Sequence, residues 1–464
     1  MKRSGGIASV VVVGGGVVGW SAAGALKRQL PMLSVTIIPI DPPPNALADR
    51  LSGTLPSIFG FHGDLGLTDA DTIAGARSSP RLGTRFENWA RRDYTHCYGP
   101  VGEPIGATPF HQQWLRDPAA KPFDCYLLAD EAALTTARSR SETGLHLTIP
   151  RYRAMMRAFA QHLGVETING ELGPVSVDGD GFIESLSLAD GRSIRADLYV
   201  DATGPAARLL SALDDAFDHW DGVLIADRLT LAEGSSQSPR PLLDTNRAHP
   251  TGWIWNAASD GAMSGGFVTS SAHAPTPPAA FRDAETISFA QGRRPSPWLR
   301  NCVAIGDAAI TVEPLEWTNL HLAHSAIDRL VAMMPGRDCA PIELAEYNRQ
   351  SREEANRVRD FLCLHYVTGP VALGEIWRDA ASVELPTTLC HTLDLFRERG
   401  RLPFNEEETF DRDSWLTVLL CQGVRPRRTD PLADLVPATE ARRAMAAIAA
   451  RSAAPRPFES PTFR

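Results

Sequence analysis

The sequence predicts an α/β protein: a parallel β-sheet flanked by helices, a second β-sheet inserted between its parts, and a helical region towards the C-terminal end. Three observations support this fold class. An unbroken β-branched run at residues 7–13 leads into glycines and an alanine-rich helix. Apolar and polar residues alternate between 175 and 200, with turn sequences among them. Beyond about Pro335 the apolar residues recur at helical spacing, most clearly in LAEYNRQSREEANRVRDFLCLHY.

The first element is a βαβ unit that predicts a dinucleotide site. The run at 7–13 reads as a central parallel strand, followed by GGGVVG, the helix WSAAGALKRQL and a second strand, SVTIIPID. Gly14, Gly16 and Gly19 allow a tight turn and the close approach of a pyrophosphate to the helix N-terminus. The acid expected after the second strand is Asp41, although prolines lie on both sides of it.

Two later pieces indicate which dinucleotide binds. The alternating segment ends in ADLYVDATGPAARLL, where a buried strand delivers Asp201 and Gly204 to a turn. NCVAIGDAAI (301–310) is a strand that delivers Gly306 and Asp307 to a turn before a helix; in FAD enzymes of this architecture that aspartate typically approaches the ribityl chain. Each piece alone is an ordinary strand and turn. The three in this order favour an FAD-binding, Rossmann-like domain over a protein that binds only a nicotinamide cofactor.

The order of these pieces sets the expected domain organisation. An FAD-binding domain over 1–335 is built from 1–45, 140–205 and 295–335, and segments 50–140 and 206–295 between them supply the substrate side. Residues 336–464 form a C-terminal helical subdomain, ending in one loosely held helix and a frayed tail.

Bulk properties exclude several classes of protein. The net charge of −9 argues against nucleic acid or an acidic membrane as the main partner, and no segment approaches the ~20 apolar residues of a membrane span. The seven cysteines are scattered without metal-ligand spacing, so we expect no metal site and a reducing, cytoplasmic location. The apolar start reads as a buried strand rather than a signal peptide. Lysine is rare: only Lys2, Lys27 and Lys121 occur.

Ten segments, in order, resemble the flavin-dependent tryptophan halogenase family, which shares its fold with GR2-type flavoprotein monooxygenases. The segments are VVVGGGVVGW, RLGTRFENW, His96-Cys97-Tyr98 with PFHQQWLR after it, DLYVDATG, GWIWNAAS, NCVAIGDAAI, VEPLEWTNLHLAHSAIDRL, EYN, RDFLCLHY and DSWLTVLLCQG. The resemblance implies that a separate reductase supplies reduced FAD, which reacts with oxygen to give a flavin hydroperoxide. Halide attacks this hydroperoxide and forms hypohalous acid. The acid travels to an aromatic substrate, where a lysine and a glutamate assist delivery of the halogen.

The sequence departs from the family at the lysine. The segment that should carry it reads SSPRLGTRFENW, and Arg81 stands in its place. An arginine stays protonated and cannot offer a neutral amine to hypohalous acid, although it can orient that molecule by hydrogen bonds. None of the three lysines is placed to substitute. A catalytic role and a purely structural role for Arg81 are equally open at this stage.

A second departure lies after PLE, where small residues of the family contribute backbone N–H groups associated with halide beside the flavin. Here Trp317, Thr318 and Asn319 follow Glu316. The N–H donors can persist, but an indole takes up space in a narrow site, and asparagine restricts a backbone that glycine would free. The alternative is that Trp317 points outward into packing and leaves the pocket open. Whether chloride or bromide still binds is therefore uncertain.

Other family positions are retained or altered only in part. Glu316 keeps the acid position, as a catalytic base or simply as an acid favoured by the helix dipole. In the loop Leu51-Ser52-Gly53-Thr54 the family's Gly-Glu-Ala-Thr is changed, while Thr54 and Pro56 remain. The resemblance implies an aromatic substrate site made by His96, Tyr98, Phe110, Trp253 and Trp255, although core packing explains such aromatics as well. The Ile-Pro that follows the family's paired tryptophans is replaced by alanines.

Three functions are consistent with these residues. The first is an FAD-dependent oxidase or monooxygenase of an aromatic, indole-like substrate, in which the halide chemistry is lost or altered; we favour this one. The second is a halogenase that uses Arg81 in place of lysine. The third is a catalytically silent FAD-binding partner protein, which the intact FAD turns disfavour. The substrate, free or tethered to a carrier or peptide, is left open, and a homodimer is plausible.

Overall fold

The computed structural model describes residues 5–128, 143–235, 242–259, 262–273 and 276–451. Its contacts divide the chain into two compact units. The first unit comprises residues 1–79, 145–221 and 287–356, and the second comprises 80–144, 222–286 and 357–464. The short strands β3 (Ser79–Arg81) and β6 (Gly144–His146) lie where the chain passes from one unit to the other.

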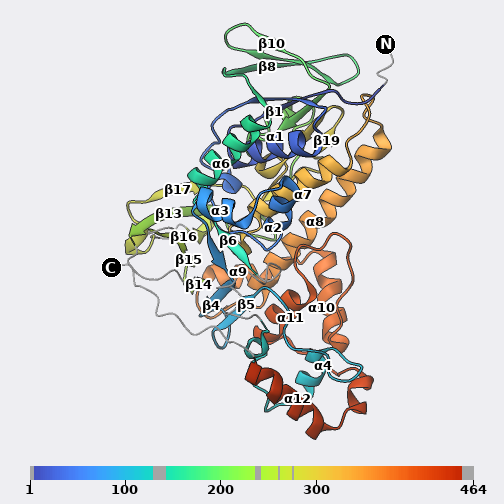
Figure 1. Cartoon of the computed structure of the whole chain (residues 1–464). Coiled ribbons are helices and arrows are strands. Elements are labelled where there is room, and N and C mark those ends of the chain that lie inside the picture. Colours follow the sequence, from blue (N-terminus) through green and yellow to red (C-terminus); the bar gives the residue numbers. More distant parts are fainter. Residues whose placement is uncertain (1–4, 129–142, 236–241, 260–261, 274–275, 452–464) are drawn as a thin grey trace. The chain divides into compact units, whose positions relative to one another are not determined.

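The first unit is built on a six-stranded sheet in the order β19-β20-β11-β1-β2-β7 (Figure 1). Its strands are β1 (Ser9–Val13), β2 (Ser34–Ile38), β7 (Glu166–Thr167), β11 (Leu198–Asp201), β19 (Trp298–Leu299) and β20 (Cys302–Ala304). All neighbours are parallel except β19 and β20. The three segments predicted to build the nucleotide domain therefore supply adjacent strands, which confirms the predicted α/β fold class.

The β-branched run is apolar throughout because both faces of its strand are buried. Val10 and Val12 belong to one apolar cluster together with residues of α1. Val11 and Val13 belong to a second cluster on the opposite face, with Tyr199. The helices of this unit are α1 (Val17–Gln29), α2 (Ile58–Leu65), α3 (Asp69–Ala76), α6 (Ile149–His162), α7 (Asn319–Ala332) and the first part of α8 (Pro341–Val367).

Two small sheets complete the first unit. The alternating segment forms an antiparallel sheet in the order β10-β9-β8, drawn at the top of Figure 1. Its strands are β8 (Leu172–Val177), β9 (Ile183–Leu188) and β10 (Ser193–Ile194), which confirms the predicted meander. The other sheet contains β12 (Asp218–His219), β18 (Gly292–Arg293) and β21 (Ile310–Thr311).

The second unit holds a seven-stranded, mainly antiparallel sheet in the order β17-β13-β16-β15-β14-β4-β5. The strands are β4 (Gly83–Glu87), β5 (Tyr94–Cys97), β13 (Arg228–Ser235), β14 (Leu243–His249), β15 (Gly252–Ser259), β16 (Ala262–Thr269) and β17 (Glu285–Ser288). The last two residues of β17 are grouped with the first unit. The helices of this unit are α4 (Phe110–Arg116), which lies between β5 and β13 in the chain, the end of α8, α9 (Glu375–Ser382), α10 (Thr387–Arg399), α11 (Arg412–Cys421) and α12 (Ala438–Arg451).

The region after Pro335 is helical, as expected, but it is not grouped as one body. Residues 341–356 of α8 belong to the first unit, and the remainder belongs to the unit that contains the seven-stranded sheet. The predicted frayed tail lies outside the described residues. Among the described residues, no helix combines the length and the apolar character that crossing a bilayer requires.

Candidate functional site

The glycine-rich turn joins β1 to α1 in a close-packed arrangement. Gly14 has a φ of 141°. A Cβ on Gly19 would lie 2.1 Å from the carbonyl oxygen of Gly14, so the first turn of the helix can approach the strand only without a side chain there. Gly16 precedes α1 as its N-cap and provides no side-chain hydrogen bond. The structure thus leaves the N-terminus of α1 to be satisfied by another group.

That group is Asp49, which the sequence analysis did not single out. Asp49 ends the short 3-10 helix η1 (Leu47–Asp49), and its Oδ1 accepts a hydrogen bond from the backbone N–H of Val18 at 3.3 Å. A Cβ on Gly16 would lie 2.1 Å from the same oxygen. Burial raises the pKa of the Asp49 carboxyl to about 6, although the backbone N–H groups oppose this shift.

Asp307 lies in η6 (Gly306–Ala308), beside the same 3-10 helix. Its Oδ2 accepts the backbone N–H of Ala48 at 2.8 Å, whereas its buried Oδ1 has no hydrogen-bond partner among the described residues. Burial, with a smaller contribution from the Asp49 charge, raises the pKa of Asp307 to about 7. A buried acceptor without a donor is costly in a native protein, so this atom indicates a place for a ligand group.

The remaining predicted cofactor residues of the first unit have different surroundings. Both carboxylate oxygens of Asp201 accept backbone or hydroxyl hydrogen bonds from its own turn, including Thr203 and Leu209. The hydroxyl of Thr54 is hydrogen-bonded to the backbone of Leu145. The side chain of Asp41 is 96% exposed and lies 3.7 Å from Arg153.

The other two predicted positions are Gly204, which follows Asp201 in the chain, and Pro56, which follows Thr54. Gly204 has a φ of 79°, where glycine is favoured, and Pro56 is half-buried just before α2.

The turn before α7 carries the most unusual backbone of the first unit. Glu316 and Trp317, in η7 (Leu315–Trp317), have φ values of 61° and 58°, the left-handed region that bulky residues rarely occupy. Both side chains are buried, each with about 1% exposure. Strain of this kind persists only where the surrounding structure enforces it, and it is common at functional sites.

The indole of Trp317 is held by two residues distant in sequence. A Cβ on Gly53 would lie 2.2 Å from the indole, so the loop before Thr54 must carry glycine here. The ring of His146 meets the indole edge to face, with centroids 5.9 Å apart. Trp317 therefore lies inside the first unit, against the Leu51–Thr54 loop, and does not point outward.

Thr318 and Asn319 begin α7 directly after this turn. The N–H of Trp317 donates to the carbonyl of Pro314, and the Asn319 side chain donates to the carbonyl of Val312 at 2.7 Å. The Oγ1 of Thr318 and the Oδ1 of Asn319 are buried without a hydrogen-bond partner in the part of the chain that the structure describes. Both atoms can accept a hydrogen bond from a ligand, and the threonine hydroxyl can also donate one.

Arg81 belongs to the second unit and is fully buried. Its guanidinium forms an ion pair with Asp244, which is also buried, and a hydrogen bond to the hydroxyl of Tyr98. A third bond, of 2.8 Å, reaches the hydroxyl of Thr84. A buried carboxylate beside the guanidinium neutralises its charge and fixes its orientation, because a planar arginine is well suited to such pairing.

The predicted substrate aromatics are all buried in the second unit. His96 lies edge to face with Tyr98 and also contacts Phe361. Trp253 donates its indole N–H to the hydroxyl of Tyr366 at 2.8 Å.

Trp255 is two residues further along β15 from Trp253, on the same face of the strand, and packs on Gly266. Phe110 begins α4 and contacts Phe123 and Tyr126. The predicted site residues thus fall into two groups: Glu316 and the cofactor residues in the first unit, Arg81 and the aromatics in the second.

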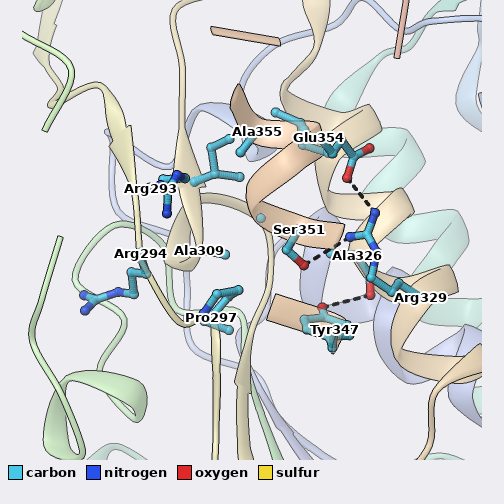
Figure 2. A pocket seen from close by; sticks show the side chains of 14 residues that line it. Arg293, Arg294, Pro297, Ala309, Ala326, Arg329, Tyr347, Ser351, Glu354 and Ala355 are labelled. Carbon is cyan, nitrogen blue, oxygen red and sulfur yellow. Dashed lines mark hydrogen bonds and ion pairs between the residues drawn. The ribbon is translucent and has the colours of Figure 1, made fainter. Parts of the chain in front are cut away.

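A cavity of about 30 Å³ lies behind the Gly306 turn, between η6, α7 and α8 (Figure 2). Arg329 bonds Glu354 at 2.9 Å and Ser351 at 3.2 Å, and Tyr347 donates to the carbonyl of Ala326. Arg293 pairs with Asp218 at 3.0 Å. The space suits ordered water, and its polar groups bond one another, so it supports the turn rather than holding a substrate.

Sequence reasoning missed Asp49, His146 and Asp244. Each acts through a contact with a residue far away in the chain, and none belongs to a recognisable motif. One signal was present for Gly53: a loop position reduced to glycine accompanied a helix turn enlarged to tryptophan. Such a compensating change of size indicates contact, but only the structure shows which residues meet.

The chain matches one protein family over most of its length. The family model described as tryptophan halogenase matches residues 9–438. The tryptophan 7-halogenase RebH of Lentzea aerocolonigenes is 27% identical over 504 residues, which cover 94% of each chain. The 7-chloro-L-tryptophan 6-halogenase KtzR of Kutzneria sp. (strain 744) is 27% identical over 445 residues and 84% of each chain.

Solved structures resemble the fold along its whole length. The flavin-dependent halogenase BrvH from Brevundimonas sp. BAL3 superposes with a TM-score of 0.88 at 30% identity, covering 98% of this chain and 97% of its own. Xcc4156, a flavin-dependent halogenase from Xanthomonas campestris, superposes with a TM-score of 0.88 at 31% identity, covering 96% of this chain and 95% of its own.

Proposed function

Because this chain belongs to the flavin-dependent tryptophan halogenase family, we propose that it oxidises or oxygenates an aromatic, indole-like substrate with the halide step altered or lost. The observation that carries the proposal is the buried indole of Trp317 against Gly53 and His146. It occupies the turn where the family resemblance implies that small residues leave room for halide.

FAD is the cofactor, and a separate flavin reductase reduces it. The residues of the first unit fit FAD. The glycine turn at the N-terminus of α1 suits a pyrophosphate. The buried Oδ1 of Asp307 can accept a hydrogen bond from a hydroxyl of the ribityl chain. When bound and reduced, FAD supplies the electrons that activate oxygen. The chain's own contribution is to bind it, to exclude water around the α7 turn and to position the aromatic substrate.

Glu316 is the acid that we assign to the reaction. Its carboxyl is buried in a turn with left-handed backbone, where it is fixed before α7. A buried carboxylate can accept the proton released when an aromatic ring is substituted, and it can stabilise positive charge on that ring. This role is the same whether an oxygen or a halogen enters the ring.

The contacts of Arg81 are consistent with the loss of the reaction step that the resemblance assigns to a lysine. Its guanidinium is paired with Asp244 and hydrogen-bonded to Tyr98 and Thr84, so each of its three nitrogens already has a protein partner. We assign it a structural role in ordering Tyr98, which together with His96 provides flat faces for an aromatic ring. Phe110, Trp253 and Trp255 complete the proposed aromatic lining.

A halogenase that uses Arg81 is the second candidate. The observation in its favour is that the relatives at 30% and 31% identity are flavin-dependent halogenases, together with the presence of Glu316. In that case Arg81 orients hypohalous acid by hydrogen bonds rather than capturing halogen on an amine.

One experiment separates these functions. Purified protein is mixed anaerobically with chemically reduced FAD and then with air, bromide and a panel of indoles, phenols and pyrroles, and products are read by mass spectrometry. A product heavier by one oxygen, or lighter by two hydrogens, with or without bromide supports the proposal. A bromine isotope doublet contradicts the loss of the halide step and favours the second candidate. No product with any substrate, from protein that binds FAD, favours a silent partner protein.

We also propose a cytoplasmic location, since all seven cysteines are free thiols, as a reducing compartment would keep them. A substrate tethered to a carrier or peptide, and a homodimer, remain predictions. Size-exclusion chromatography with light scattering measures the second of these directly.

A further inference from the structure

We propose that Asp49 occupies the place of an anion at the N-terminus of α1, and that FAD binds there with the uptake of one proton by Asp49. The inference concerns cofactor binding and does not depend on whether the reaction is oxidation or halogenation. It adds a residue to the cofactor site and makes the affinity for FAD depend on pH.

The geometry places the Asp49 carboxylate against the glycine turn. Oδ1 accepts the N–H of Val18 at 3.3 Å, and both oxygens lie within 2.5 Å of the position that a Cβ on Gly16 would take. The side chain is buried, with 8% exposure. A helix N-terminus attracts one anionic group through its free N–H groups and its dipole, and here the chain itself supplies that group.

A second observation indicates a ligand at the same place. Asp307 approaches η1 from η6, and its Oδ2 takes the N–H of Ala48, the residue before Asp49. Its Oδ1 is buried and lacks a partner among the described residues. Two carboxyl groups thus converge on the end of α1, one bonded to the helix and the other with an unused acceptor.

The charged groups near Asp49 do not supply enough positive charge to neutralise both its carboxylate and a second anion. Asp307 on η6 repels it, and Arg153 on α6 attracts it, although Arg153 also lies 3.7 Å from Asp41. η1 also packs against α1 and α7. Their titratable and charged side chains are Lys27 and Arg28 in the last turn of α1, and His321, His324, Asp328 and Arg329 on α7.

A pyrophosphate brought to an ionised Asp49 meets direct repulsion in a buried setting, where charges interact strongly. Protonation removes this conflict. The neutral carboxyl also becomes an O–H donor that can bond a phosphate oxygen. Burial already raises the pKa of Asp49 to about 6, so the proton is available from water at modest cost near neutral pH. The balance is one proton from solvent for each FAD bound, and no covalent bond changes.

The test is the dissociation constant of oxidised FAD between pH 5.5 and 8.5, measured by flavin fluorescence with wild type, Asp49→Asn and Asp307→Asn. Each phosphorus of FAD carries one strongly acidic oxygen, so the cofactor keeps its charge over this range. For wild type we expect affinity to fall about tenfold per pH unit above pH 6. Asp49→Asn should lose this dependence and bind FAD at pH 8 about as tightly as wild type does below pH 6. Asp307→Asn should retain the dependence.

Calorimetry of the wild type in buffers of different ionisation enthalpy gives an independent measurement, which holds even if a variant fails to fold. At pH 7.5 the proposal requires uptake close to one proton per FAD. Wild-type affinity that is independent of pH, or uptake near zero, overturns the proposal. A pH dependence that persists in Asp49→Asn overturns it too, because the proton then resides on another group.

Discussion

The indole of Trp317 and the backbone of Gly53 lie so close that a Cβ on Gly53 would be 2.2 Å from ring atom Cδ2 and 2.5 Å from Cγ. The ring is buried, and it also meets His146 edge to face. A buried, rigid ring cannot move aside cheaply, so the two positions are coupled in size. This pair relates the altered loop before Thr54 to the altered turn before α7.

Gly53→Ala should therefore destabilise the protein by about 1–3 kcal/mol, because it overpacks a closed site. The loss should largely disappear in the background Trp317→Ser, which removes the indole. Urea unfolding of the single and double variants measures the coupling. Gly60→Ala is the matched control, since a Cβ there meets nothing within 4 Å in helix α2. Additive effects of Gly53→Ala and Trp317→Ser would contradict the coupling.

Asp244→Asn should lower the free energy of unfolding by about 3–5 kcal/mol, because it leaves the buried guanidinium of Arg81 without its counter-charge. The control is Glu87→Gln on the same sheet, which weakens the pair with Arg247. Those side chains are 17% and 42% exposed, and such a partly solvated pair contributes about 1 kcal/mol or less. Equal losses for the two variants would show that Arg81 is not held by Asp244.

Arg81→Lys tests whether the family's amine chemistry can be recovered. A lysine beside Asp244 should remain an ammonium ion, since a neighbouring carboxylate stabilises the charged form. We therefore expect no brominated product from the single variant with reduced FAD, air and bromide. Mass spectrometry of the indole panel gives the answer. Bromination by Arg81→Lys would show that the rest of the halide route is open despite Trp317.

Glu316→Gln should reduce product formation about 10²–10⁴-fold in a single turnover with reduced FAD, as expected when a general base is removed. FAD binding, followed by flavin fluorescence, should stay within a few-fold of wild type, because the amide has the same shape. Rapid mixing with air and liquid chromatography measure the rate. A rate close to that of wild type would remove Glu316 from the catalytic residues.

The pH dependence of apoprotein stability provides a separate check on the buried acids. Burial raises the folded-state pKa of Asp49 to about 6 and of Asp307 to about 7, from 3.8. Between pH 4 and 7 the folded state then holds more protons than the unfolded state. These two groups therefore make stability fall as pH rises through this window, with no further change above it.

Buried histidines act with the opposite sign in part of that window. Burial lowers the pKa of His62 to about 4, so its contribution to stability increases as pH rises from about 4 to 6.5. The contribution of Asp49 is therefore separated from that of the histidines by comparing the urea unfolding of wild type and Asp49→Asn at pH 4.5 and 7.5. The variant should gain stability relative to wild type at the higher pH. An equal difference at both pH values would contradict the raised pKa of Asp49.

The sequence alone determined the class of fold and the positions of its turns. Residues 7–13 are apolar at every position because both faces of a central parallel strand are buried, and this pattern can be read without a structure. The glycine turn, the turn after Asp201 and the turn at Gly306 are local motifs whose backbone requirements are encoded in adjacent residues. The resemblance to the family, in turn, made the replacement of small residues by Trp317 visible in the sequence.

Only the tertiary structure decided what those residues contact. Asp49 meets the N-terminus of α1, Trp317 meets Gly53, and Arg81 meets Asp244, across 31, 264 and 163 positions of the chain. No local propensity encodes such pairs, because they arise when distant segments pack together and must satisfy one another's volume and charge. An aspartate in a loop reads as an exposed polar residue until burial shows that it is held against a helix end. The physical reason is that side-chain identity sets what a residue can do, while its surroundings set its charge and its available space.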